Sequence, residues 1–388
     1  MERLRIAYVF DQALSESAAD NEQVVNTVGA LLRAGLEVVL VLPVSRDSDS
    51  ATADEIRAQY CVDGNFRVEY FRMLFDVPRV LEKGIFALSS AFYRHYLRNF
   101  DLVMCRNISV ACACMSAGVP VFYDTYRPWV KQYRALVPVF RWMFGNRHFL
   151  GMSLHSDYSR RSYLRFGFDE SKIITAYNGY SRKHFEPVLS VAEARARIGV
   201  EVPGKLAVYA GRMEMSKGID TILRVAEGVP ECTFLLVGGR GQQDVEERVS
   251  RLDNVLTAGW QSYDCLPSYL YAADVLMSPT TSGPLRKVGN TVLPIKLFSY
   301  LAAGRAIFAP ESPDTAELLT HGKNSYLVAA DDPEAALSGF RALIGDDVLL
   351  ERLSQGACET GRGLSWDTRG ELLEGFISRR FSQYRDNN

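Results

Sequence analysis

Short apolar runs alternate with segments of helical period along most of the chain. In the first half these runs are rich in β-branched residues and flanked by turn residues, which is typical of strands. The expected strands cover residues 5–10, 37–42, 66–71, 102–105, 119–123, 149–153 and 172–175. Residues 21–33 place valines and leucines on one helical face, and Gly35 follows as a stop signal. The pattern therefore begins with a βαβ unit.

A second series of strand-like runs follows Pro187, and a helix-like segment comes after each run. These runs cover residues 207–210, 233–237, 255–258, 275–278, 306–309 and 326–328. Alternation of this kind predicts an α/β protein with two doubly wound, Rossmann-like domains in tandem. We expect an amino-terminal domain over 1–187, a carboxyl-terminal domain over 188–368, and a last helical segment within 369–388 that packs on either domain, the first included.

Composition agrees with this organisation and narrows the choice of partners. The 388 residues suit two domains, and 44 basic against 46 acidic side chains leave a net charge of −2, which disfavours a nucleic-acid partner. The first residues show no export signal, and no long apolar stretch suits a membrane helix, so we expect a cytoplasmic protein. Seven cysteines without a CxxC pair indicate reduced thiols.

Candidate chemistry lies where the strand at 207–210 ends. Gly211 and Arg212 follow that strand, and Lys217 precedes the next expected helix. The carboxyl end of a parallel strand is where open α/β sheets bind ligands. A glycine lets the backbone come close to a ligand, while an ammonium and a guanidinium suit phosphate oxygens. These residues predict a diphosphate site, and the alternative is that Arg212 and Lys217 are solvated loop charges.

A second basic element lies further along the chain, at the start of the helix expected near 294–304. The amino-terminal end of that helix would offer backbone N–H groups to an anion, and Lys296 adds a positive charge. Two such elements can stabilise negative charge that develops on a diphosphate without a metal. The five histidines show no HExxH spacing, so we expect neither a metal nor another cofactor.

These segments resemble, in order, the landmarks of retaining glycosyltransferase family 4 (glycosyl transferases group 1). The resemblance covers about residues 150–370. Its landmarks are Ser156 to Gly167, Lys172-Ile173-Ile174, Asn178-Gly179, Gly211-Arg212 with Lys217-Gly218, Leu236-Val237-Gly238-Gly239, Gly259-Trp260, Ala272-Ala273-Asp274-Val275, Ser278-Pro279 and the helix from Pro294 to Gly304.

The resemblance implies a GT-B fold with an interdomain cleft, a first domain that binds the acceptor and a second that binds a nucleotide sugar. It implies metal-independent transfer of a hexose to an acceptor hydroxyl, with retention at the anomeric carbon. Arg212 and Lys217 are then the catalytic residues. The implied donor-binding residues are Gly211, Gly238, Gly259, Trp260, Thr291, Pro294, Ile295, Lys296 and Ser299, and the implied acceptor-side residues are Asp11, Tyr126 and Arg127.

The largest departure from the family concerns two carboxylates. The family usually has two glutamates eight positions apart, where this chain has Thr291 and Ser299. Hydroxyls accept hydrogen bonds more weakly than carboxylates. Two other interpretations therefore stay open: a non-catalytic protein that binds a nucleotide or sugar, and an enzyme related to sugar-nucleotide epimerases or phosphorylases.

Residues 127–148 interleave aromatic and basic side chains. Trp129, Tyr133 and Trp142 alternate there with Lys131 and several arginines. This composition is compatible with an interfacial helix at the inner face of a membrane, and a lipid-linked glycan would then fit as the acceptor, beside a saccharide or a small metabolite. The alternative is that the aromatic stripe belongs to the core.

Overall fold

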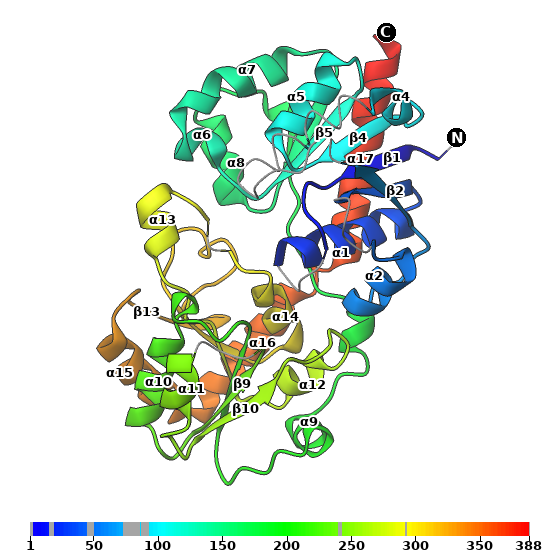
Figure 1. Cartoon of the computed structure of the whole chain (residues 1–388). Helices are drawn as coiled ribbons and strands as arrows, with labels where there is room; N and C mark the ends of the chain where they lie inside the picture. The colour runs from blue at the N-terminus through cyan, green and yellow to red at the C-terminus, as the bar shows by residue number, and fades with distance from the viewer. Residues whose placement is uncertain are drawn as a thin grey trace. The chain divides into compact units, whose positions relative to one another are not determined.

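The computed structural model describes residues 3–14, 19–44, 50–72, 86, 93–239, 243–291 and 293–387 (Figure 1). The chain forms two compact units. The first unit combines Met1–Asn178 with Trp366–Asn388, and the second is Gly179–Ser365. The chain thus leaves the first unit at Asn178, whereas the sequence pattern places the boundary near 187. It returns to the first unit at Trp366. The last helix belongs to the first unit.

The first unit is built on a parallel sheet of seven described strands in the order β3-β2-β1-β4-β5-β6-β7. The strands are β1 (Arg5–Val9), β2 (Glu37–Val44), β3 (Arg67–Arg72), β4 (Leu102–Cys105), β5 (Val121–Thr125), β6 (Phe149–Leu154) and β7 (Ile173–Thr175). β1 pairs with β2 on one side and with β4 on the other, with Ile6 opposite Val38 and Leu102. The carboxyl ends of β1, β4 and β5 therefore lie side by side.

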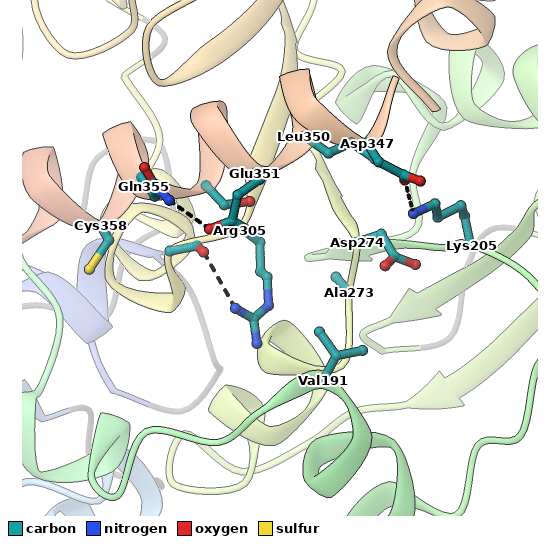
Figure 2. Close-up of a pocket in the computed structure, with 12 residues that line it drawn as sticks. Val191, Lys205, Ala273, Asp274, Arg305, Asp347, Leu350, Glu351, Gln355 and Cys358 are labelled. Carbon is teal, nitrogen blue, oxygen red and sulfur yellow. Dashed lines mark hydrogen bonds and ion pairs between the residues drawn. The ribbon is translucent and has the colours of Figure 1, made fainter. Parts of the chain in front are cut away.

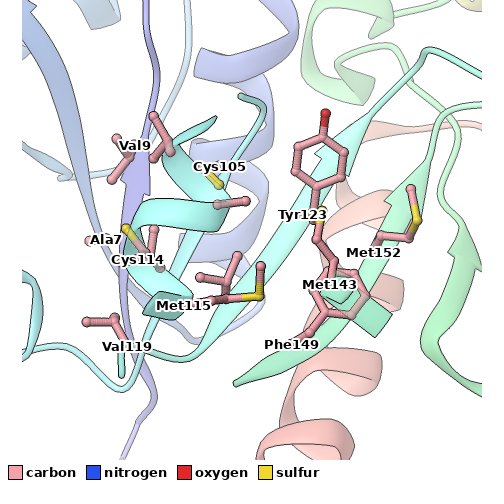
Figure 3. Packing of buried hydrophobic residues seen from close by; sticks show 14 of the residues in the cluster. Ala7, Val9, Cys105, Cys114, Met115, Val119, Tyr123, Met143, Phe149 and Met152 are labelled. Atoms are coloured by element: carbon pink, nitrogen blue, oxygen red, sulfur yellow. The ribbon is translucent and has the colours of Figure 1, made fainter. Parts of the chain in front are cut away.

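Helices pack on both faces of this sheet. They are α1 (Ala19–Arg33), α2 (Ala53–Tyr60), α4 (Arg94–Leu97), α5 (Ile108–Ser116), α6 (Trp129–Gln132), α7 (Val137–Gly145), α8 (Asp157–Leu164) and α17 (Trp366–Asp386). One face carries alternate strand residues such as Ala7, Val9 and Tyr123, which pack with Cys114 of α5 and Met143 of α7 (Figure 3). Burial of this apolar surface is the main source of stability of the layer.

The helices α1 and α17 pack against each other although 347 positions separate their starts in the sequence. A Cβ atom on Gly370 of α17 would lie 2.5 Å from the carbonyl oxygen of Ala30, so the two helices come too close for a larger residue. The ring of Phe376 meets Phe122 of β5 edge to face, with centroids 5.9 Å apart. The last helix is thus a full part of the first unit's core.

The second unit repeats the plan with six described strands, all parallel, in the order β10-β9-β8-β11-β12-β13. These are β8 (Leu206–Ala210), β9 (Thr233–Val237), β10 (Val255–Gly259), β11 (Val275–Met277), β12 (Ala306–Pro310) and β13 (Ser325–Val328). Its helices are α9 (Val191–Ile198), α10 (Ile219–Gly228), α11 (Gln243–Val249), α12 (Leu266–Tyr271), α13 (Gly283–Val288), α14 (Lys296–Ala303), α15 (Pro333–Ile344) and α16 (Asp347–Gly361). Both α/β domains expected from the sequence are present.

The aromatic and basic segment after β5 is divided between core and surface. Pro138 lies in the first turn of α7, so α6 and α7 are separate short helices. Phe140 and Met143 are buried in the core, whereas Tyr133 and Trp142 are 48% and 44% exposed. Among the described residues, no helix combines the length and the apolar character needed to cross a bilayer.

Candidate functional site

The first βα turn of the second unit, at the end of β8, is closed around Gly211. This glycine has φ +147°, a conformation that L side chains rarely adopt, and its amide donates to the carbonyl of Val237 at 2.9 Å. A Cβ atom at this position would lie 3.0 Å from Tyr209 Oη and 3.5 Å from Lys296 Nζ. A side chain at position 211 would crowd the Tyr209 hydroxyl and come into contact with the Lys296 ammonium group.

Two further glycine turns lie next to Gly211. A Cβ atom on Gly238 would be 1.9 Å from the Gly211 carbonyl oxygen, so the turn after β9 touches the turn after β8 only because residue 238 has no side chain. The amide of Gly238 donates to the carbonyl of Gly259 at 2.8 Å. The structure thus brings together the three glycines that the sequence pointed to, at the carboxyl ends of β8, β9 and β10.

Lys296, the first residue of α14, reaches this edge from the other side of the turn. Its ammonium nitrogen lies 4.0 Å from the centre of the Tyr209 ring, a cation–π contact. Tyr300, one turn further along α14, accepts from the Ala210 amide at 2.8 Å and donates to the Met277 carbonyl at 3.2 Å. These bonds tie α14 to the ends of β8 and β11 and fix the position of Lys296.

Electrostatics at this edge favour an anion. Burial and the positive charge of Lys217 lower the pKa of Lys296 to about 7. A lysine whose charged form is disfavoured in the free protein gains strongly from a neighbouring negative charge. No side chain caps the amino terminus of α14 in the described structure, so its positive dipole end adds to the same field.

Arg212 and Lys217 flank the turn on its exposed side. The Arg212 side chain is 54% exposed, and its guanidinium lies 3.8 Å from the Glu214 carboxylate. The Tyr209 hydroxyl donates to the Arg212 carbonyl at 2.9 Å, which holds the backbone of the turn. Lys217 is exposed and precedes Gly218, a left-handed residue (φ +81°) at the start of α10. Three cations therefore belong to this one edge of the sheet.

The other expected donor-binding residues differ in exposure and in their contacts. Trp260 follows the left-handed Gly259 (φ +67°) and is 53% exposed. Thr291 is buried and its hydroxyl accepts from the Leu293 amide at 3.2 Å. Pro294 and Ile295 precede the first turn of α14, and Ser299 lies half-buried within it. No contact within the described ranges joins Trp260 or Ser299 to Lys217 or Lys296.

A pocket of about 410 Å³ lies at the opposite, amino-terminal edge of the second sheet (Figure 2). Lys205, Asp274 and Arg305, which directly precede β8, β11 and β12, line it together with residues of α16. Three of its charged side chains are already paired: Lys205 with Asp347 at 2.5 Å, and Asp274 with Arg195 at 2.7 Å. This pocket is separate from the glycine turns and offers a matched location for control substitutions.

The expected acceptor-side residues lie at the carboxyl ends of β1 and β5 in the first unit. Asp11 is buried and accepts from the Asn107 side chain at 2.7 Å. Tyr126 and Arg127 follow β5, and Arg127 Nε donates to Tyr126 Oη at 3.0 Å. Arg106, which the sequence did not single out, follows β4 and lies with its guanidinium carbon 5.7 Å from the centre of the Tyr126 ring. Adjacency of β4 and β5 in the sheet brings these residues together.

A buried ionic cluster, also missed from the sequence, lies in the same unit. Asp124 at the end of β5 bonds to His155 Nε2 at 3.0 Å and to Arg369 Nη2 of α17 at 2.9 Å. Tyr8 donates to the same carboxylate at 3.1 Å. The side chains of Asp124 and Arg369 are fully buried. An aspartate inside an otherwise apolar strand was the signal, because a buried carboxylate needs partners.

The cluster fixes the charge of each member. Burial raises the pKa of Asp124, but Arg369 and then His155 outweigh it and hold this pKa well below its usual range. Burial lowers the pKa of His155 to about 4, although Asp124 acts in the other direction. At neutral pH the cluster therefore consists of a carboxylate, a neutral imidazole and a guanidinium.

The second unit is similar in sequence to known glycosyltransferases. Residues 204–346 match the family model described as glycosyl transferases group 1. The D-inositol 3-phosphate glycosyltransferase of Streptomyces avermitilis is 24% identical over 217 residues, which cover 52% of this chain and 45% of that protein. The chain spans about half the length of the curated relatives it matches.

Solved structures match the whole chain in fold. Sucrose-phosphate synthase from Thermosynechococcus elongatus superposes with a TM-score of 0.76 at 18% identity, covering 98% of this chain and all of that one. The Anabaena protein HepE, in complex with UDP-glucose, gives a TM-score of 0.70 at 17% identity over 98% of this chain and all of that one. The two sheets thus form the GT-B fold. The matched model lies over the three glycine turns and over Lys217 and Lys296, so the second unit is similar to the glycosyl transferases group 1 family.

Proposed function

We propose that this protein transfers a hexose from a nucleoside diphosphate sugar to an acceptor hydroxyl, with retention at the anomeric carbon and without a metal. The observation that supports it most is the set of three cations, Arg212, Lys217 and Lys296, at the Gly211 turn. Two of them lie close enough to lower a pKa, an arrangement that a bound diphosphate would relieve. UDP-glucose is the first donor to test, because HepE binds it.

In this proposal the bond between the anomeric carbon and the β-phosphate oxygen breaks, and a bond from that carbon to the acceptor oxygen forms. The acceptor proton goes to an oxygen of the leaving phosphate, so no protein base is needed. Arg212 and Lys217 stabilise the negative charge that grows on the diphosphate, and Lys296 neutralises it from the buried side. Trp260 offers an exposed ring on which a nucleobase can stack.

The second unit would hold the donor and the first unit the acceptor, near Asp11, Tyr126 and Arg127. A second candidate function is a non-catalytic nucleotide-binding protein. The observation that favours it is the engaged hydroxyl of Thr291, which bonds to the Leu293 amide where the family has a carboxylate. An epimerase-like enzyme is the third.

Calorimetry with UDP, GDP, ADP, dTDP and CDP tests the donor site. We expect one nucleotide to bind best and Arg212→Ala to weaken that binding by about tenfold or more, since a hydrogen bond between charged groups contributes roughly 1.5–3 kcal/mol. Lys205→Ala, at the opposite edge of the sheet, should leave the affinity unchanged.

Nuclear magnetic resonance of the sugar product then separates the three functions. Transfer with retained configuration, or slow hydrolysis of the donor, supports the transferase. Nucleotide binding without turnover supports the binding protein, and inversion at a sugar carbon of the intact donor supports the epimerase. Binding of none of the nucleotides would contradict the donor site itself.

Affinity for UDP should fall as pH rises from 7 to about 9. Lys296 loses its proton near pH 7 in the free protein, whereas the bound diphosphate favours the charged lysine, so binding takes up a proton. The fall approaches roughly tenfold per pH unit, since one pKa unit corresponds to 1.36 kcal/mol. Lys296→Met should bind more weakly at pH 7 with a flatter profile. A profile equally steep in this variant would assign the titration to another group.

A further inference from the structure

Arg127 is held in a fixed position, and no carboxylate of the described residues pairs with it. Its Nε donates to Tyr126 Oη, and its guanidinium carbon lies 5.4 Å from the centre of the Tyr126 ring and 4.9 Å from that of Trp129. Within the described residues no acidic side chain pairs with it. Two aromatic rings thus restrict a guanidinium whose four terminal N–H donors have no anionic partner, and such a fork suits oxyanions.

A second guanidinium shares the same tyrosine. Arg106 lies 5.7 Å from the centre of the Tyr126 ring and 6.0 Å from that of Phe10. Its side chain is only 8% exposed, and it donates to the carboxylate and the carbonyl of Asp20, each at 3.2 Å. Asp20 neutralises Arg106, whereas Arg127, which contacts the same tyrosine ring, has no counter-charge among the described residues.

The surroundings reinforce the positive potential. Five lysines and arginines and no aspartate or glutamate occur between Asp124 and Asp157 in the sequence. One of them, Lys131 on α6, lies 4.6 Å from the centre of the Tyr158 ring and bonds to its hydroxyl. Arg127 and Lys131 are thus both packed on aromatic rings and both free of described ion pairs.

We propose that Arg127, with Tyr126 and Lys131, binds a phosphate group carried by the acceptor. This assignment rests on the proposed function, in which the first unit binds the acceptor. It adds the chemical class of that acceptor. The phosphate belongs either to a soluble sugar phosphate or to a lipid headgroup, and both offer the same oxyanion to the guanidinium. A neutral saccharide would leave Arg127 without a partner.

Binding measurements with matched variants test the assignment. Calorimetry compares glucose 6-phosphate with glucose, and co-sedimentation compares phosphatidylcholine vesicles with and without phosphatidylglycerol. The variants are Arg127→Gln, Arg127→Lys and, as the control, Arg134→Gln, which removes an exposed cation seven positions away. UDP affinity of each variant serves as the measure of an intact second unit.

We expect a phosphate-bearing probe to bind better than its neutral counterpart, and Arg127→Gln to weaken it by about tenfold or more, the size of one charged hydrogen bond. Arg127→Lys should lie between, because it keeps the charge and loses the fork. The responding arm identifies the source: glucose 6-phosphate for a soluble acceptor, anionic vesicles for a lipid.

Equal losses in Arg127→Gln and Arg134→Gln would overturn the assignment, because diffuse surface charge would then explain the binding. An unchanged affinity in Arg127→Gln, or no preference of the unaltered protein for phosphate in either arm, would overturn it as well. If UDP binds normally in those cases, the proposed function is unaffected. If UDP does not bind while phosphate binding follows Arg127, the proposed function fails and the anion site remains.

Discussion

Lys217→Ala should lower the turnover number of sugar transfer by about 10²- to 10³-fold, the loss seen when one donor to a developing anion is removed. The donor KM should change much less. Lys217 lies at the exposed side of the Gly211 turn, and in the proposed function negative charge grows there on the leaving diphosphate as its bond to the sugar breaks. An interaction that strengthens in the transition state appears in turnover more than in ground-state binding.

The control for this prediction is Lys205→Ala. Lys205 is a lysine of the same unit that pairs with Asp347 at the amino-terminal edge of the same sheet, so its removal changes the net charge equally. Turnover of this variant should match that of the unaltered protein. If both lysine variants lose activity to the same extent, the effect is one of overall charge or folding. If Lys217→Ala retains full turnover, Lys217 has no role in departure of the leaving group.

The strands could be predicted because each of them is a local pattern. Apolar, β-branched runs fix which residues are buried between two layers of helices, and all of the expected runs are strands in the structure. The ends of strands shifted by one or two residues. β5 begins at Val121 where we expected 119, because Pro120 has no amide to donate to a ladder.

The grouping of the three glycine turns with basic residues could also be predicted from the sequence. Gly211, Arg212 and Lys217 lie within seven positions of one another, and the convergence of Gly238 and Gly259 follows from the rule that parallel strands end at one edge. What the sequence did not supply was the interaction between Lys296 and Tyr209. That contact depends on the angle at which α14 meets the sheet, which Tyr300 sets through its bonds to β8 and β11.

The first unit held the residues that sequence reasoning missed. Arg106 becomes a neighbour of Tyr126 only because β4 and β5 are adjacent in the sheet. Arg369 lies 245 positions from its partner Asp124, and nothing local in α17 distinguishes it from the exposed arginines of that helix. Pairings of this kind depend on the return of the chain to the first unit, and the sequence left open where the last helix packs.

Arg369→Met should lower the free energy of unfolding of the first unit by about 3–5 kcal/mol, the usual effect of removing one partner from a buried ion pair. The Asp124 carboxylate would stay buried without its main counter-charge. The carbonyls of Ala176 and Tyr177 and the Thr27 hydroxyl would lose the donors that join β7, α1 and α17. Adding Asp124→Asn should recover part of the loss, since the unpaired charge is then gone.

Arg33→Met is the matched control, because Arg33 pairs with Asp367 at 2.6 Å and joins the same two helices, α1 and α17, at an exposed position. An exposed pair contributes roughly 0–1 kcal/mol, so this variant should unfold almost like the unaltered protein. Urea unfolding followed by fluorescence reports mainly on the first unit, which holds three of the four tryptophans. If Arg369→Met costs no more than Arg33→Met, burial of the cluster is not what ties α17 to the sheet. If UDP restores the stability of Arg369→Met, the two units do not unfold independently, because the proposed nucleotide site lies wholly in the second unit.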